Sequence, residues 1–206
     1  MSYETELKIA WATLAVQDEK LAVIINKHGP CTLKPHTDYY GSLVSAIIGQ
    51  QLSEKAGSTI EKRFRGLYED KLPNPEQIMT TNPDSIRQIG VSYGKISYMK
   101  DLATHIIDGR LDLCKLSSES NINIIAKLTD IKGIGEWTAQ MFLIFSLGRL
   151  DVLPTGDLGV RKSMMRVYEL AEMPDPKTMK DIAVHNNWTG YESIASWYLW
   201  RNLDNQ

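Results

Sequence analysis

Apolar residues recur at helical spacing along much of the chain, and the alternating pattern of a half-buried strand is scarce. The segments Val44–Leu52 and Trp137–Phe145 show the spacing clearly, with apolar side chains three or four positions apart. A repeat of this kind forms one apolar stripe along a helix, which must pack against other elements. The pattern predicts an all-α fold.

Short polar breaks separate the predicted helices. Asn82-Pro83 and Asp175-Pro176 each resemble an N-cap residue followed by proline at the first helical position. Four glycines fall near predicted helix ends, namely Gly66, Gly90, Gly109 and Gly148. No internal repeat or low-complexity segment interrupts this series of helices.

The composition indicates which cellular compartment and which cofactors are plausible for this protein. No stretch approaches the roughly 20 apolar residues of a membrane helix, and residues 1–8 are polar and mixed in charge, unlike a secretory signal. We expect no membrane association and an intracellular location, in the cytoplasm or nucleoid of a prokaryote or the nucleus of a eukaryote. Cys31 and Cys114 are too few and too far apart for a zinc or iron–sulfur site, so we expect both to fill the core.

The formal net charge of −2 counts against binding DNA through overall charge. A protein with this net charge could still bind DNA through a local basic face. Basic residues gather within residues 55–65, 95–100 and 161–166. Such a run is commonly a solvated helix face, so both interpretations stay open here.

Residues 121–148 predict two helices joined by a tight turn. The first covers residues 121–128, and the second runs from Glu136 to about Leu147. Gly133-Ile134-Gly135 lies between them and allows positive φ and the close approach of a foreign surface, with Ile134 anchored in the core.

Outward-facing amides in this turn and in the first turn of the next helix would form an anion site. DNA phosphate is such an anion. The alternative is an ordinary glycine turn between packed helices.

Four segments together resemble a large superfamily of DNA glycosylases with a helix–hairpin–helix motif. Residues 128–139 match the hairpin, and residues 151–161, with Pro154-x-x-Asp157, match the loop and aspartate that follow it. Residues 46–53 are similar to the segment that wedges DNA. Residues 197–201, Trp-Tyr-Leu-Trp-Arg, resemble the end of the 3-methyladenine DNA glycosylase II branch. The hairpin alone is weakly specific, but the combination is highly specific.

The resemblance, which runs from about residue 38 to residue 201, implies a single domain over residues 1–206. We expect two helical subdomains with the active cleft between them. One would comprise roughly residues 41–148, and the other residues 1–40 together with residues 149–206.

Asp157 is the expected catalytic carboxylate. Loss of a base builds positive charge on the deoxyribose, and a fixed carboxylate stabilises that charge and can orient water. Asp157 would lie at the start of a helix from Leu158 toward Leu170, whose positive end favours the ionised form. The alternatives are that Asp157 is only an N-cap or that Asp151 is the essential acid.

The resemblance also indicates which chemistry is missing. Bifunctional relatives carry a nucleophilic lysine where this chain has Trp137, so no Schiff base is expected here. An iron–sulfur cluster of the kind that some relatives hold would need four cysteines. We expect no cofactor, although the resemblance leaves room for a monovalent cation at the hairpin.

The resemblance places Trp137 and Trp200 on the base pocket. An indole face attracts a flipped cationic base. Met141 and Leu158 stand where some relatives carry tyrosine, which would make the pocket less aromatic. Three other aromatic residues are expected to be core, namely Trp188, Trp197 and Tyr198.

Gln51 is the candidate wedge that fills the hole left by a flipped base, unless it simply caps a helix end. Backbone binding is expected from Gly133, Ile134, Gly135 and Arg161, with residues 90–95 as a weaker candidate.

Taken together, the sequence predicts a monomeric, monofunctional glycosylase that removes 3-methyladenine and 7-methylguanine from damaged double-stranded DNA. The alternatives are a glycosylase for deaminated or oxidised bases and a non-catalytic DNA-binding protein.

Overall fold

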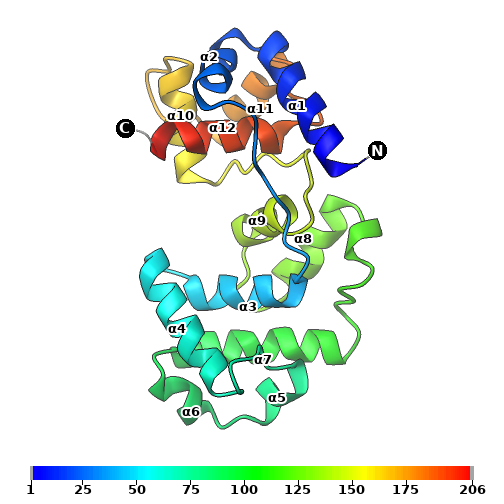
Figure 1. Cartoon of the computed structure of the whole chain (residues 1–206), viewed down its shortest axis with the longest axis vertical. Coiled ribbons are helices and arrows are strands. Elements are labelled where there is room, and N and C mark those ends of the chain that lie inside the picture. The colour runs from blue at the N-terminus through cyan, green and yellow to red at the C-terminus, as the bar shows by residue number, and fades with distance from the viewer. Residues whose placement is uncertain (1, 205–206) are drawn as a thin grey trace. The chain divides into compact units, whose positions relative to one another are not determined.

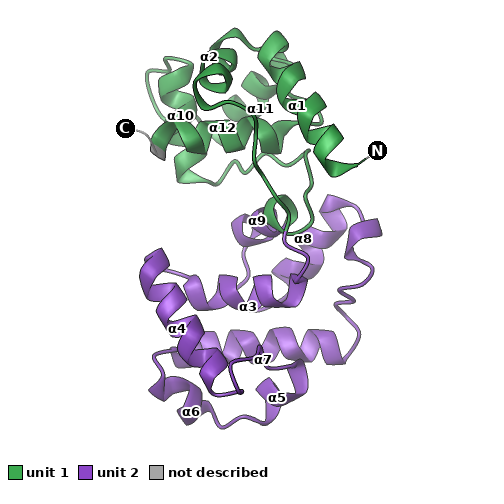
Figure 2. Cartoon of the chain, in the orientation of Figure 1, with its two compact units in different colours: residues 1–35, 143–206 green, residues 36–142 purple. Residues whose placement is uncertain are grey.

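The computed structural model describes residues 2–204, so Met1 and residues 205–206 of the predicted domain lie outside it. Within this range the chain forms twelve α-helices and one 3-10 turn, and no strand (Figure 1). The predicted all-α fold is confirmed. The chain divides into two compact units, residues 1–35 with 143–206 and residues 36–142 (Figure 2).

Unit 1 contains α1 (Tyr3–Gln17), α2 (Glu19–His28), α10 (Leu158–Val167), α11 (Pro176–His185) and α12 (Glu192–Asp204). The last helix, α12, packs against α1, α2 and α10. The largest fully buried side chains of this unit are Trp188, Tyr198, Leu14, Leu21 and Ile25.

Unit 2 contains α3 (Tyr39–Gly49), α4 (Glu54–Gly66), α5 (Pro75–Thr80), α6 (Pro83–Gln88), α7 (Tyr93–Ile107), the 3-10 turn η1 (Leu116–Ser118) and α8 (Asn121–Thr129). The long helix α7 packs against α3, α5 and α6, and α3 also packs against α4 (Figure 1). Its core includes Leu43, Ile47, Phe64, Ile78 and Met99.

The helix α9 (Glu136–Phe145) crosses the boundary between the units, which falls after residue 142. The observed boundaries lie after residues 35 and 142, whereas the predicted ones lay after residues 40 and 148. The last turn of α9 is grouped with unit 1, where Phe145 packs against an aromatic ring of α12.

Polar caps define where most helices begin. Side chains accept a backbone N–H of the first turn at Ser2, Asp18, Asp38, Ser53, Asn74, Asn82, Ser92, Ser120, Asp157 and Asp175. Such a cap typically contributes about 1 kcal/mol. The predicted Asn-Pro and Asp-Pro starts of α6 and α11 are confirmed.

Cys31 is buried and burial raises its pKa to about 11, whereas Cys114 is exposed. The expectation that both thiols fill the core is therefore wrong for Cys114. Its amide donates to Asp112 Oδ1 in a surface turn.

Candidate active site and hairpin

Asp157 is a buried carboxylate, 8% exposed, at the start of α10 in unit 1. Its Oδ1 accepts the amide N–H of Val160 at 2.8 Å, which makes Asp157 the N-cap of α10. The same oxygen accepts the indole Nε1–H of Trp200 at 2.8 Å. Asp157 therefore is an N-cap, but it is also tied to an aromatic side chain from another helix.

Trp200 reaches Asp157 from α12. Its ring lies 5.6 Å from that of Phe145, centroid to centroid. A Cβ atom at Gly159 would lie 3.1 Å from both Asp157 Oδ1 and Trp200 Cδ1, so the glycine makes room for the indole. Gly159 is not among the site residues predicted from the sequence. Its signal in the sequence is a glycine in the first turn of a helix, where a residue of higher helix propensity would be expected.

The neighbours of Asp157 differ in exposure. Leu158 is 54% exposed, which is high for a leucine. Asp151 is exposed, in contrast to the buried Asp157. Arg161 is half-buried and its Nε donates to the carbonyl of Pro174 at 2.9 Å. The expected contact of Arg161 with the DNA backbone stays a prediction.

Trp137 and Met141 lie one turn apart on α9 and so share a helix face. Trp137 is 49% exposed, and Met141 is half-buried. Trp137 is therefore the more exposed of the two side chains on this face of α9. By contrast, Trp188 and Tyr198 are fully buried, which confirms their assignment to the core, whereas Trp197 is only half-buried.

The hairpin runs from α8 through residues 130–135 into α9. The amide of Lys132 donates to Asp101 Oδ2 at 2.8 Å, and the amide of Ile134 donates to Ile131 O at 3.1 Å. Within residues 2–204, the intervening amides of Gly133 and Gly135 donate to no protein acceptor. The turn thus alternates amides used internally with amides left available.

The two hairpin glycines serve different purposes. Gly133 has a φ of 80°, and a Cβ atom there would lie 2.1 Å from Cδ2 of Tyr98. Gly135 lies outside the positive-φ region, and a Cβ atom there would meet nothing within 4 Å. A positive φ therefore accounts for the presence of glycine at position 133 but not at position 135. Ile134 is 4% exposed, which confirms that it anchors the turn in the core.

Gln51 lies at the third position of a β-turn that follows α3. Gln50 has φ −49° and ψ 130°, Gln51 has φ 58°, and Leu52 N donates to Gly49 O at 3.1 Å. This is the geometry of a type II turn, whose third position favours glycine. A glutamine held there is exposed and strained, which is a common mark of a functional position.

Two of the basic side chains found in the sequence are engaged inside unit 2. Lys95 Nζ donates to Ile48 O and Gln50 O, both at 2.7 Å. Lys100 Nζ donates to Met79 O at 3.2 Å and Thr81 O at 3.4 Å. Both ammonium groups therefore have hydrogen-bond partners within the protein, and phosphate binding by the basic runs stays a prediction.

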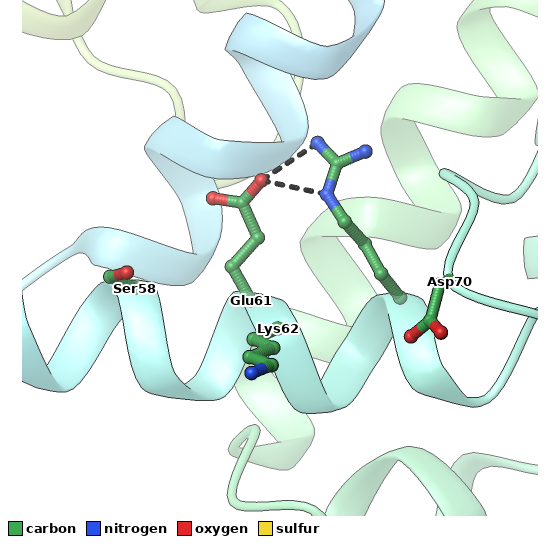
Figure 3. A pocket seen from close by; sticks show the side chains of 5 residues that line it. Ser58, Glu61, Lys62 and Asp70 are labelled. Carbon is green, nitrogen blue, oxygen red and sulfur yellow. Dashed lines mark hydrogen bonds and ion pairs between the residues drawn. The ribbon is translucent and has the colours of Figure 1, made fainter.

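The α4 helix bears two shallow hollows. One, of about 510 Å³, is lined by Ser58, Glu61, Lys62, Arg65 and Asp70 (Figure 3). Glu61 Oε1 accepts from Arg65 Nη2 at 2.8 Å and from its Nε at 3.1 Å, so these two charges neutralise each other. The other is lined by Ser53, Lys55, Ala56, Thr59, Ile60 and Arg63. Neither hollow contains a predicted site residue.

Residues 2–204 also bear on metal binding and membrane insertion. No three His, Cys, Asp or Glu side chains there are grouped so that they could hold a metal ion. None of the helices in that range is both long enough and apolar enough to cross a bilayer.

Known proteins resemble this chain in sequence and in structure. Residues 44–185 match the family model described as "HhH-GPD superfamily base excision DNA repair protein". An alkylbase DNA glycosidase-like protein of Schizosaccharomyces pombe is 30% identical over an alignment of 209 residues. The alignment covers 98% of this chain and 96% of that protein.

Two solved structures are similar over most of their length. A DNA-3-methyladenine glycosidase from Bacillus halodurans has a TM-score of 0.81 and 41% identity, covering 92% of this chain and 86% of that one. A 3-methyladenine DNA glycosylase of Schizosaccharomyces pombe, in complex with abasic DNA, has a TM-score of 0.81 and 31% identity. The match covers 95% of this chain and 96% of that one.

Proposed function

The chain belongs to the HhH-GPD superfamily of base excision DNA repair proteins, and we propose that it is a monofunctional DNA glycosylase for alkylated purines. It hydrolyses the N-glycosidic bond of 3-methyladenine and 7-methylguanine in double-stranded DNA and leaves an abasic site. The single observation that carries this proposal is the buried carboxylate of Asp157, held by a helix N-terminus and by the indole of Trp200.

Asp157 acts on the sugar in this mechanism. As the bond from C1′ to the purine nitrogen breaks, its electron pair leaves with the base and positive charge develops on the deoxyribose. A carboxylate fixed by two donors stabilises that charge without having to reorganise. Water then bonds to C1′ and releases its proton, and a methylated purine that was cationic leaves as a neutral base.

Trp137 makes the enzyme monofunctional, because an indole cannot attack C1′ as an amine does. Its half-exposed side chain, with Met141 one turn along α9, instead supports stacking of the flipped base. Trp200 and Leu158 of unit 1 stay predicted residues of the base pocket. A purine methylated at N3 or N7 is cationic, and cation–π attraction favours such a base over a neutral one of similar shape.

The hairpin binds the DNA backbone rather than a base. The available amides of Gly133 and Gly135, next to the N-terminus of α9, suit a phosphate oxygen. Arg161 is a second candidate for backbone binding, and Gln51 for the wedge. A monovalent cation at the hairpin stays a prediction, as do a monomeric state and an intracellular location.

The direct experiment incubates the purified protein with methylated duplex DNA and identifies the released bases by chromatography. We expect 3-methyladenine and 7-methylguanine. Release of hypoxanthine or uracil with a greater enhancement over spontaneous loss would favour a glycosylase for deaminated bases. Binding without any release would favour a non-catalytic DNA-binding protein.

A further inference from the structure

The turn that carries Gln51 needs support from outside itself. Gln51 has a φ of 58°, a conformation that a residue with a Cβ atom adopts rarely, and its side chain is exposed. The single hydrogen bond that closes the turn, from Leu52 N to Gly49 O, does not select this form, because type I turns have the same closing bond. Something else must hold Gln51 in place.

Lys95 supplies one such restraint from the first turn of α7. Its Nζ donates to the carbonyls of Ile48 and Gln50 at 2.7 Å each, so the ammonium group bridges the residues on either side of Gly49. These carbonyls lie at the end of α3, where helix carbonyls lack intrahelical partners and attract a cation. Lys95 is half-buried, and loss of solvent lowers its pKa.

Gln50 supplies the second restraint. Its Nε2 donates to the carbonyl of Gly133 at 2.6 Å, across 83 positions of sequence. The residue next to Gln51 is therefore bonded directly to the hairpin turn. Both restraints lie within unit 2.

We propose that Lys95 and Gln50 are positioning residues that fix Gln51 in its strained conformation and in register with the hairpin. This inference rests on the proposed function. With Lys95 in place, the Gln51 side chain enters the base stack while the hairpin grips the backbone of the same duplex. Without Lys95 the turn relaxes, Gln51 leaves the left-handed region, and its side chain points elsewhere.

Lys95→Met tests the proposal, with Lys100→Met as the matched control. Both lysines come from α7, both are half-buried, and each bonds two carbonyls at the end of a helix. Only Lys95 reaches the turn of Gln51. We expect the single-turnover rate of 7-methylguanine release, at saturating enzyme, to fall about tenfold in Lys95→Met and to stay within twofold in Lys100→Met.

Gln51→Ala and the double variant Lys95→Met/Gln51→Ala complete a thermodynamic cycle. If Lys95 acts through Gln51, Lys95→Met should have little further effect on the rate in the Gln51→Ala background. Gln50→Met should behave like Lys95→Met, and Lys95→Arg, which keeps a donor, should recover part of the rate. Thermal melting of each variant separates these effects from loss of folded protein.

A binding readout does not depend on excision. A duplex carries a tetrahydrofuran abasic analogue with 2-aminopurine beside it, and the fluorescence increase on protein binding reports unstacking. We expect the increase for the wild type and Lys100→Met, and a loss of most of it for Gln51→Ala, Gln50→Met and Lys95→Met.

Equal fluorescence for Lys95→Met and the wild type, or additive rate effects in the cycle, would overturn the inference. Failure of the wild type to release methylated bases would instead overturn the proposed function, and the fluorescence result would still decide the role of Lys95.

Discussion

Trp200 Nε1 donates to Asp157 Oδ1 at 2.8 Å, and this bond joins α12 to the N-cap of α10. The same unit repeats the arrangement elsewhere. Trp188 Nε1 donates at 2.8 Å to Oδ2 of Asp18, a buried carboxylate that caps α2. The second pair lies in the core and offers a matched control for the first.

Trp200→Phe keeps an aromatic ring and removes the indole donor. We expect the excision rate to fall by about tenfold, which corresponds to about 1.4 kcal/mol of transition-state stabilisation, because Asp157 loses the indole donor that helps to fix it. Trp188→Phe should lower stability by about 1–3 kcal/mol, because the buried Asp18 carboxylate loses its indole donor and keeps only those of Leu21 and Tyr168. The rate per folded molecule should stay unchanged. Single-turnover rates with melting curves check both. Equal rates for Trp200→Phe and the wild type would show that the indole donor is not needed.

Selectivity for charged bases depends on the same indole. Cation–π attraction contributes about 0.5–2 kcal/mol, so Trp200→Ala should reduce the rate enhancement more for 7-methylguanine than for the neutral base hypoxanthine. Because cationic bases also leave spontaneously, the comparison must use enhancement over uncatalysed loss. An equal reduction for both bases would show that Trp200 does not recognise the charge of the base.

Substitutions of the two hairpin glycines should distinguish effects on folding from effects on DNA binding. Gly135→Val meets open space and should leave thermal stability almost unchanged, while the added side chain blocks a phosphate from the turn. We expect affinity for damaged and undamaged duplex to fall by similar factors. Gly133→Val collides with Tyr98 and should lower the melting temperature as well. Loss of lesion discrimination in Gly135→Val, with unchanged affinity for undamaged duplex, would contradict the backbone role.

The monofunctional mechanism predicts the outcome of borohydride trapping. With Trp137 where bifunctional relatives carry lysine, no protein–DNA adduct should form on a duplex with 7-methylguanine, and the product strand should stay intact until treated with alkali. A stable adduct would mean that another amine attacks the sugar.

Local signals made much of the fold predictable. The predicted hairpin helices, residues 121–128 and 136 to about 147, are close to the observed α8 and α9. The helix after Asp157 was expected to reach Leu170 but ends at Val167. Capping and periodicity act over a few residues, so they locate the starts of helices well. The end of α10 was harder to predict, because Tyr168 continues the apolar pattern but lies outside the helix.

Tertiary contacts were not predictable in the same way. Asp157 and Trp200 are 43 positions apart, and no local pattern indicates their bond. Lys95 looked like part of a basic run, but its role depends on where α7 packs against the end of α3. The positive φ of Gln51 is equally invisible in the sequence, because glutamine carries none of the usual signals of a left-handed turn residue.

If the Asp157 carboxylate drives base release, the variant Asp157→Asn must lose most of it. Asparagine is a good N-cap, so stability should change little. We expect the single-turnover release of 3-methyladenine and 7-methylguanine to fall by at least about 100-fold, comparable to the loss of one preorganised electrostatic group in other enzymes. DNA affinity should hold or improve slightly, because a negative charge near phosphate is removed.

Asp18→Asn, measured in parallel, changes the other buried carboxylate that caps a helix and accepts an indole N–H. It should lower thermal stability and leave the release rate per folded molecule within about twofold of the wild type, because it removes one hydrogen-bond acceptor far from the chemistry. Of the two variants, only Asp157→Asn should lose most of its base release. A stable Asp157→Asn protein that retains most of its activity would contradict this prediction.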